Sequence, residues 1–583
     1  MSHANADTRT PPDFKRRPLH NSPLPDARLR WIALCVLAAL LLSSCKQMNL
    51  NEQDKLSSRD AAKTANNAPA PIFQGTPMPG LDSASAQEKV KGLSAQRRDG
   101  HADDREFNTE AYSHIEENPF FDVARAPLST FSIDVDTASY SNTRRFLKDG
   151  QLPPKDAVRI EELINYFSYD YPQPAGDAPF SINAEVSACP WNTKHRLVHI
   201  GLQGRRMLKE DLPPANLVFL LDVSGSMNAP NKLPLVKSSL RMLAEQLDAR
   251  DRLSIVVYAG SSGLVLPSTP GDRRGEILAA LDSLEAGGST NGGEGIQLAY
   301  KVAAENFIRG GINRVILATD GDFNVGTTSE GELTRLVEEK RRSGVFLSVL
   351  GFGTGNVKDA TMEKLADRGN GNYAYIDEAQ EARKVLGEQL GATLATIAKD
   401  VKIQVEFNPR QAAAYRLIGY ENRLLRDEDF NDDTKDAGEI GAGHTVTALY
   451  EVVPFGQKFE NPGVDELKYQ KPAEVSSNAG SRELMTIKIR YKDPEASASK
   501  LLSVWVADAG GTLESASNNF KFSSAVAGFG MLLRDSKYKG DVRYADVATL
   551  ARAAAGADAQ GYRTEFIQLV ERAQALSRQS ARN

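Results

Sequence analysis

The sequence predicts an α/β domain with a doubly wound parallel sheet, inserted into a discontinuous β-sandwich and followed by C-terminal helices. In residues 213–398, short continuously apolar segments alternate with amphipathic ones, which is typical of buried parallel strands covered by helices on both faces. Alternating strands such as 182–186 and 401–407 flank this region and need partners across it, because two strands alone are marginal. Apolar residues recur at helical spacing in residues 515–583.

The length and composition of the chain indicate that it contains several domains. A chain of 583 residues is long enough for two or three domains, and its apolar content of 41% is enough for their cores. The net charge of −6 is small, and no basic block stands out beyond the N-terminus. Nucleic acid is therefore not an expected partner.

The N-terminal segment predicts a location. Arg28 and Arg30 precede the apolar run 31–42, which is too short for an ordinary membrane span and typical of a signal peptide. The run leads into Leu42-Ser-Ser-Cys45, which resembles the lipobox of bacterial lipoproteins. That resemblance implies cleavage before Cys45 and attachment of lipid to it; a short anchor helix is the alternative.

The residues around the expected cleavage site refine this location. Lys46 stands where an Asp would favour retention in the inner membrane, so we expect the outer membrane, on its periplasmic or surface face, in a Gram-negative host. Removal of Cys35 with the signal and lipidation of Cys45 leave only Cys189, so no intramolecular disulfide is expected.

Composition divides the chain into six expected segments. Residues 46–117 are rich in Ala, Ser, Asn and Gln with little apolar periodicity, which is typical of a disordered tether. The expected segments are 1–45 (signal peptide), 46–117 (tether), 118–212 (extension with sandwich strands), 213–398 (α/β domain), 399–514 (remaining sandwich) and 515–583 (helices).

Small oxygen-bearing side chains follow the ends of the predicted parallel strands. One buried strand ends in an aspartate followed by two serines at alternate positions, a Gly-rich turn supplies a threonine, and a second buried strand ends in another aspartate. Open α/β sheets bind ligands at this edge, and such oxygens suit a hard divalent cation. The five candidate ligands are Asp222, Ser224, Ser226, Thr290 and Asp320.

The order Asp-x-Ser-x-Ser, Thr, Thr-Asp-Gly resembles the metal-ion-dependent adhesion site (MIDAS) of von Willebrand factor A (VWA) domains. The resemblance implies a VWA, Rossmann-like fold with these five residues as metal ligands. The expected metal is Mg²⁺, with Mn²⁺ and Ca²⁺ as alternatives. Two carboxylates leave the ion able to bind a further anionic oxygen, which in this family often comes from an Asp or Glu of a protein partner. The competing interpretation is that these residues only cap helices and turns.

Segments outside the α/β region resemble a narrower family. Residues 127–140, 157–167 and 189–192 resemble the N-terminal extension of a bacterial family of VWA lipoproteins. Residues 428–433, 437–444 and 561–566 resemble the C-terminal domain of that family, whose function is uncharacterised.

Five weaker patterns are expected to be structural: residues 134–139, 351–355 and 427–436, the pair Glu439 and His444, and the pair His195 and His199. The first lacks the companion motifs of a MIDAS, and the glycines lack the spacing of a dinucleotide fingerprint. The acidic loop does not fit an EF-hand, and the histidines lack further zinc ligands. Cys189 is expected to be a small buried residue.

Together these patterns predict a lipid-anchored cell-envelope protein that binds a protein partner through a metal ion. One alternative is an envelope scaffold whose metal only stabilises the fold. The other is a metal-dependent hydrolase, which is disfavoured because the sequence offers no evident general base beside the metal site. An enzyme is therefore not expected.

Overall fold

The computed structural model describes residues 110–133, 136–290, 292–321, 330–354, 358–389, 394–459 and 475–580. The predicted signal peptide, Cys45 and most of the predicted tether lie outside the described residues. Within the described ranges, no helix is long and apolar enough to span a membrane. The end of the predicted tether contacts the folded part of the chain, because Glu110 pairs with Arg145 at 2.9 Å.

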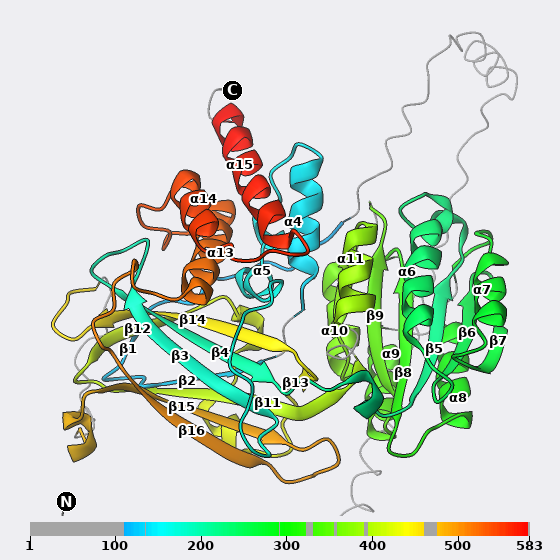
Figure 1. Cartoon of the computed structure of the whole chain (residues 1–583), viewed down its shortest axis with the longest axis horizontal. Coiled ribbons are helices and arrows are strands. Elements are labelled where there is room, and N and C mark those ends of the chain that lie inside the picture. The colour runs from blue at the N-terminus through cyan, green and yellow to red at the C-terminus, as the bar shows by residue number, and fades with distance from the viewer. Residues whose placement is uncertain are drawn as a thin grey trace, which may run out of the picture. The chain divides into compact units, whose positions relative to one another are not determined.

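The α/β domain contains a mostly parallel sheet with helices on both faces (Figure 1). Across the sheet, the described strands are β10 (Tyr373–Ile376), β9 (Phe346–Phe352), β8 (Ile312–Thr319), β5 (Ala215–Asp222), β6 (Arg252–Tyr258) and β7 (Ser262–Pro270). The surrounding helices are α6 (Leu233–Gln246), α7 (Arg274–Asp282), α8 (Gly292–Glu305), α9 (Glu330–Arg342), α10 (Asp359–Arg368) and α11 (Ala379–Arg383).

The side chains of β5 show why this strand is apolar throughout. Leu217, Phe219 and Leu221 enter one core with residues of α6, α7 and α11. Val218 and Leu220 enter a second core with residues of α8, α9 and α10. A strand buried on both faces needs a continuous apolar run, so the predicted fold class is confirmed.

The sheet differs from the prediction at one edge, because β7 runs antiparallel to β6. Only residues 259–261 separate these two strands. A parallel connection needs a crossover of a dozen residues or more, so this link permits only a hairpin.

The β-sandwich is assembled from both sides of the α/β domain. In the described residues, one sheet has the order β1-β12-β14-β4-β3; the other has the order β13-β11-β15-β16, and β2 pairs with β11. Strands before the α/β domain are β1 (Phe121–Asp122), β2 (Leu128–Ser132), β3 (Phe180–Ala188) and β4 (Arg196–Gly204). Those after it are β11 (Thr396–Phe407), β12 (Ala412–Ile418), β13 (Gly438–Gly441), β14 (Thr445–Pro454), β15 (Glu483–Lys492) and β16 (Lys500–Ala507). Pairing of β4 with β14 confirms that the sandwich is discontinuous.

The C-terminal helices share a core with helices of the N-terminal extension. These elements are α4 (Ala138–Lys148), α5 (Ile160–Asn165), α13 (Asn518–Arg534), α14 (Tyr544–Ala553) and α15 (Tyr562–Ser580). Phe167, just after α5, makes edge-on ring contacts with Phe522 of α13 and Phe566 of α15. The apolar stripe after residue 515 therefore packs inside the protein.

One buried arginine joins the extension, the α/β domain and the last helix. The Arg144 side chain, on α4, is fully buried. Its guanidinium pairs with Asp377 and, at 2.7 Å, with Glu381, both of which follow β10. It also pairs with Glu565 of α15 at 3.3 Å. The Tyr166 hydroxyl accepts a hydrogen bond from Arg144 at 3.0 Å and donates one to Glu381 at 2.9 Å.

Replacing this arginine tests whether the junction holds the three parts together. We expect Arg144→Met to lower the free energy of unfolding by about 3–5 kcal/mol, because it leaves buried carboxylates without their cation. Urea denaturation followed by circular dichroism measures the change. Arg552→Met is the matched control, because its ion pair with Glu571 is about half exposed and is worth no more than about 1 kcal/mol. Equal losses in the two variants would contradict the assignment.

Candidate functional site

The pairing of β5 with β8 places two aspartates at one edge of the sheet. The strands are parallel, with Leu221 of β5 opposite Ala318 of β8. Asp222 is the last residue of β5, and Asp320 follows the last residue of β8. Both residues are fully buried. Because the carboxyl ends of parallel strands meet at the same edge, both aspartates come to this edge of the sheet.

The turn after β5 brings the two serines to Asp222. The Asp222 Oδ1 atom accepts a hydrogen bond from the Ser224 backbone N–H at 2.9 Å. The Oγ atoms of Ser224 and Ser226 are 3.0 Å apart. Two carboxylates and two hydroxyls of the predicted set are thus brought together by direct contacts or by strand pairing.

The Gly-rich turn that contains Thr290 is hydrogen-bonded to the turn after β5. The Gly225 N–H donates to the Gly288 carbonyl at 3.0 Å, and the Gly287 N–H donates to the Val223 carbonyl at 2.8 Å. Gly288 has a φ of 81°, a left-handed conformation that favours glycine. These bonds fix the turn beside the serines, and the half-buried Thr290 follows two residues later. The hydrogen bonds of this turn therefore determine where the backbone of Thr290 lies.

Burial makes the site electrostatically suited to a cation. The hydroxyls of Tyr258 and Thr319 lie 3.1 and 3.4 Å from Asp222 Oδ2 and donate to it. Burial nevertheless raises the pKa of Asp222 to about 6. The nearby charge of Asp320 also raises this pKa, whereas the hydrogen bonds from Ser224 lower it. A divalent cation bound at this site would favour the charged form of Asp222.

A lysine also belongs to this site. The Lys232 Nζ atom donates to Asp320 Oδ2 at 3.0 Å, and both side chains are buried. Sequence patterns did not reveal this contact, since 88 residues separate the partners. The available signal is a basic residue immediately before the helix that follows Asp-x-Ser-x-Ser.

The donor set fits a hard divalent cation. Among the described residues, no group of three or more His, Cys, Asp or Glu side chains converges to hold a metal. Two buried carboxylates next to two contacting serine hydroxyls still form an all-oxygen set, which Mg²⁺ and similar ions prefer. Asp222, Ser224, Ser226, Thr290 and Asp320 would hold the ion, which would act as an electrophile for a further anionic oxygen.

Residues in two of the weaker sequence patterns make hydrogen bonds within the fold. Asp136 accepts a hydrogen bond from the Tyr373 N–H at 2.8 Å, and Asp134 lies outside the described residues. His195 contacts Glu451 at 2.6 Å, whereas His199 contacts the Tyr171 hydroxyl at 2.6 Å.

The remaining patterns belong to turns or to the core. Gly353 has a φ of 77°, as a tight turn requires. Residues 427–431 form a short 3-10 helix, in which Asp429 pairs with Arg426 at 2.9 Å. Burial lowers the pKa of His444 to about 4, which favours its neutral form. Cys189 is buried, as expected.

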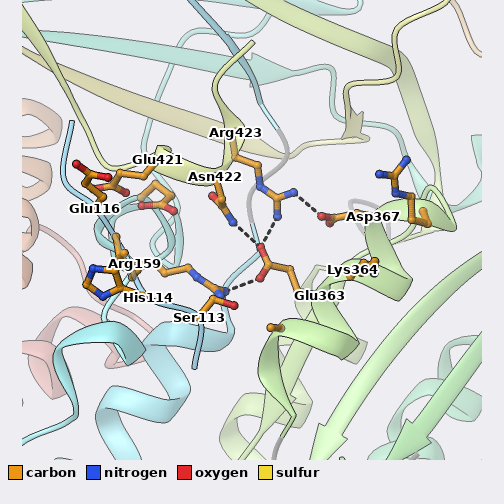
Figure 2. A pocket seen from close by; sticks show the side chains of 14 residues that line it. Ser113, His114, Glu116, Arg159, Glu363, Lys364, Asp367, Glu421, Asn422 and Arg423 are labelled. Atoms are coloured by element: carbon orange, nitrogen blue, oxygen red, sulfur yellow. Dashed lines mark hydrogen bonds and ion pairs between the residues drawn. The ribbon is translucent and has the colours of Figure 1, made fainter. Parts of the chain in front are cut away.

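A cavity of about 490 Å³ lies between residues 113–116, α5, α10 and residues 421–423. Figure 2 shows Glu363 between Arg159 and the neighbouring side chains Asn422 and Arg423. The Glu363 carboxylate lies 2.8 Å from nitrogen atoms of all three residues. Arg423 also pairs with Asp367. These charges are paired across three segments, so we assign them to the support of the fold.

Glu161 lines the same cavity and carries an unusual protonation equilibrium. It is 3% exposed, and its Oε2 atom has no hydrogen-bond partner in the described part of the chain. Burial raises the pKa of Glu161 to about 8, with smaller contributions from the charges of Glu421 and Glu162. Glu161 is therefore largely protonated at neutral pH.

The fold and the comparisons define the chain as a VWA-domain protein. Residues 216–388 match the family described as von Willebrand factor type A domain, and residues 106–199 match a family described as von Willebrand factor. Residues 392–576 match the C-terminal region of uncharacterized protein YfbK. The chain is 45% identical over 476 residues to uncharacterized protein YfbK of Escherichia coli (strain K12), a match that covers 80% of this chain and 82% of that protein. It therefore belongs to the YfbK family.

More distant relatives and solved structures match smaller shares of the chain. The chain is 25% identical to E3 ubiquitin-protein ligase WAV3 of Arabidopsis thaliana, over 48% of this chain and 39% of that protein. Among solved structures, von Willebrand factor type A from Catenulispora acidiphila aligns with 65% of this chain and 88% of its own, at 16% identity and a TM-score of 0.37. The ArnB paralog VWA2 from Sulfolobus acidocaldarius aligns with 68% of this chain and 98% of its own, at 14% identity and a TM-score of 0.35.

The protonation of Glu161 predicts a pH dependence of stability. Between its ordinary value of 4.5 and about 8, the folded protein keeps a proton that the unfolded chain loses. The contribution of Glu161 to the free energy of unfolding therefore falls as pH rises through this window, by about 1.4 kcal/mol per pH unit. We expect Glu161→Gln to remove this decline, so that the variant is more stable than wild type at pH 8.

Urea denaturation at pH 5, 6.5 and 8 measures the Glu161 effect. Glu339→Gln is the matched control, because the Glu339 side chain is 72% exposed. A variant whose stability keeps the wild-type dependence on pH would show that Glu161 titrates normally in the folded protein.

Proposed function

We propose that this protein is a lipid-anchored component of the bacterial cell envelope whose VWA domain binds a protein partner through a divalent cation. Asp222, Ser224, Ser226, Thr290 and Asp320 would hold the cation, with Mg²⁺ expected and Mn²⁺ or Ca²⁺ as alternatives. The observation that carries the proposal is the pair of fully buried aspartates at neighbouring strand ends, beside two serine hydroxyls in contact.

The chemistry of the set favours a shared ion. Three of the five ligands are neutral hydroxyls, so the ion would remain a strong electrophile. Mg²⁺ also keeps part of its coordination shell as water, which another oxygen ligand can replace. A carboxylate from an Asp or Glu of the partner matches this requirement in charge and hardness. The metal would then join two proteins without chemical turnover.

Binding is proposed over hydrolysis because of the groups around the aspartates. Tyr258, Thr319 and Lys232 direct hydrogen-bond donors at the two carboxylates. None of these three offers the histidine or carboxylate base that usually activates a water molecule. The buried junction at Arg144 supports a second candidate, an envelope scaffold in which the metal only stabilises the fold.

Loss of one aspartate tests the adhesion proposal. We expect Asp222→Ala to weaken Mg²⁺ binding at least about tenfold, because residues that bind a metal directly matter at least as much as the groups that orient them. Isothermal titration calorimetry measures the affinity, and cross-linking pull-down from envelope extracts, with Mg²⁺ or EDTA, measures partner capture. Asp248→Ala is the control, because that carboxylate is 37% exposed and pairs with Arg250.

The two candidate functions give different results in this experiment. Adhesion requires capture of a partner by wild type that is lost both in EDTA and in Asp222→Ala. A scaffold shows a higher melting temperature with Mg²⁺ but no metal-dependent capture. Equal capture by both proteins in both conditions would contradict adhesion.

The anchor is tested separately from the metal. We expect Cys45→Ser to abolish incorporation of labelled fatty acid and to move the protein from the membrane fraction to the soluble fraction. Metabolic labelling and fractionation of a bacterial host measure both effects. Cys189→Ala is the control, because Cys189 lies in the folded core. Labelling of Cys45→Ser at the wild-type level would exclude Cys45 as the lipid site.

A further inference from the structure

Lys232 is a buried cation beside the proposed metal site. It directly precedes α6, and only 6% of its side chain is exposed. Its Nζ atom lies 3.0 Å from Oδ2 of Asp320, whose side chain is fully buried. A buried ammonium is costly unless a charge offsets it, and Asp320 provides that charge.

The side-chain stem and the backbone of this lysine are held by the fold. A Cβ atom at Gly353 would lie 2.4 Å from Lys232 Cε and 2.6 Å from Lys232 Cγ, so the lysine stem occupies the space that a side chain would fill. The backbone of Lys232 is also fixed, because its N–H donates to the Ala229 carbonyl and its own carbonyl accepts from Val236, both at 2.9 Å. Because both its stem and its backbone are held, Lys232 is expected to stay paired with Asp320 unless another cation competes for that carboxylate.

We propose that Lys232 is a built-in counter-ion that occupies Asp320 in the metal-free protein and must be displaced from it when the metal binds. This inference rests on the proposed metal site. The ammonium reduces the charge of the aspartate pair from −2 to −1 and repels an incoming cation. It therefore lowers the affinity for metal and, at the same time, keeps the empty site folded.

Exchange of the ammonium for the metal explains how the site can be stable both without and with a bound metal. Without metal, two adjacent buried carboxylates repel each other, and the lysine offsets part of that repulsion. With metal, the cation takes over this role and the ammonium is released from the carboxylate. Metal binding is thus converted into a movement of Lys232, which lies at the start of α6.

Removal of the charge tests the proposal directly. We expect Lys232→Met to bind Mg²⁺ and Mn²⁺ about tenfold more tightly than wild type, because a like charge next to the site is lost. Its melting temperature in EDTA falls, and its upward shift with Mg²⁺ exceeds that of wild type. Lys237→Met is the matched control, because Lys237 lies on α6 close to Lys232, but its Nζ atom donates to the Asp282 carbonyl at 3.1 Å. Titration calorimetry and thermal melting measure these effects.

Chemical labelling of lysines in the wild-type protein provides a measurement that does not require a variant to fold. Acetylation of Lys232, quantified by mass spectrometry, is expected to rise when saturating Mg²⁺ displaces the ammonium from Asp320. Labelling of Lys237 is expected to stay constant.

The outcomes separate the counter-ion role from the metal site itself. If wild type binds Mg²⁺ but Lys232→Met binds it equally or more weakly, the counter-ion role is wrong and the metal site stands. Unchanged labelling of Lys232 under saturating metal would also overturn the counter-ion role alone. If neither wild type nor Lys232→Met binds Mg²⁺ or Mn²⁺, the proposed metal site fails, and the inference fails with it.

Discussion

The register between β5 and β8 is the constraint on which the site depends. Parallel pairing with Leu221 opposite Ala318 brings the ends of both strands to the same edge. A shift of one residue would turn the side chains of one strand to the opposite faces. The register is in turn fixed by the two cores on either side of the sheet, which take alternate residues of β5. Packing of the hydrophobic layers therefore decides where two charged groups meet.

The sequence predicted those parts of the fold that depend on local patterns. Continuous apolar runs identified the parallel strands, because a strand buried on both faces consists mainly of apolar residues. Alternation identified the sandwich strands, and helical spacing identified the C-terminal helices. The antiparallel position of β7 was missed, although the three residues that separate it from β6 carry the necessary information.

Contacts that depend on how separate elements pack against each other could not be predicted from the sequence. Asp222, Ser224 and Ser226 stand within five positions of one another, so their proximity could be inferred from sequence alone. The pairing of Lys232 with Asp320 could not, because it depends on how the start of α6 lies against the end of β8. The ring contacts of Phe167 with Phe522 and Phe566 join segments more than 350 residues apart. The charged cavity around Glu363 likewise combines four segments that no single pattern relates.

The buried position of Arg144 has a consequence for how the molecule can be divided. A VWA fragment cut at the ends of its sequence match would retain Asp377 and Glu381 and lose the guanidinium that neutralises them. Removal of α15 alone would take away Glu565 and uncover the aromatic cluster beneath it. These contacts predict that the YfbK-type extension and the C-terminal helices form a single folding unit with the VWA domain, which is therefore not expected to act in this chain as an exchangeable module.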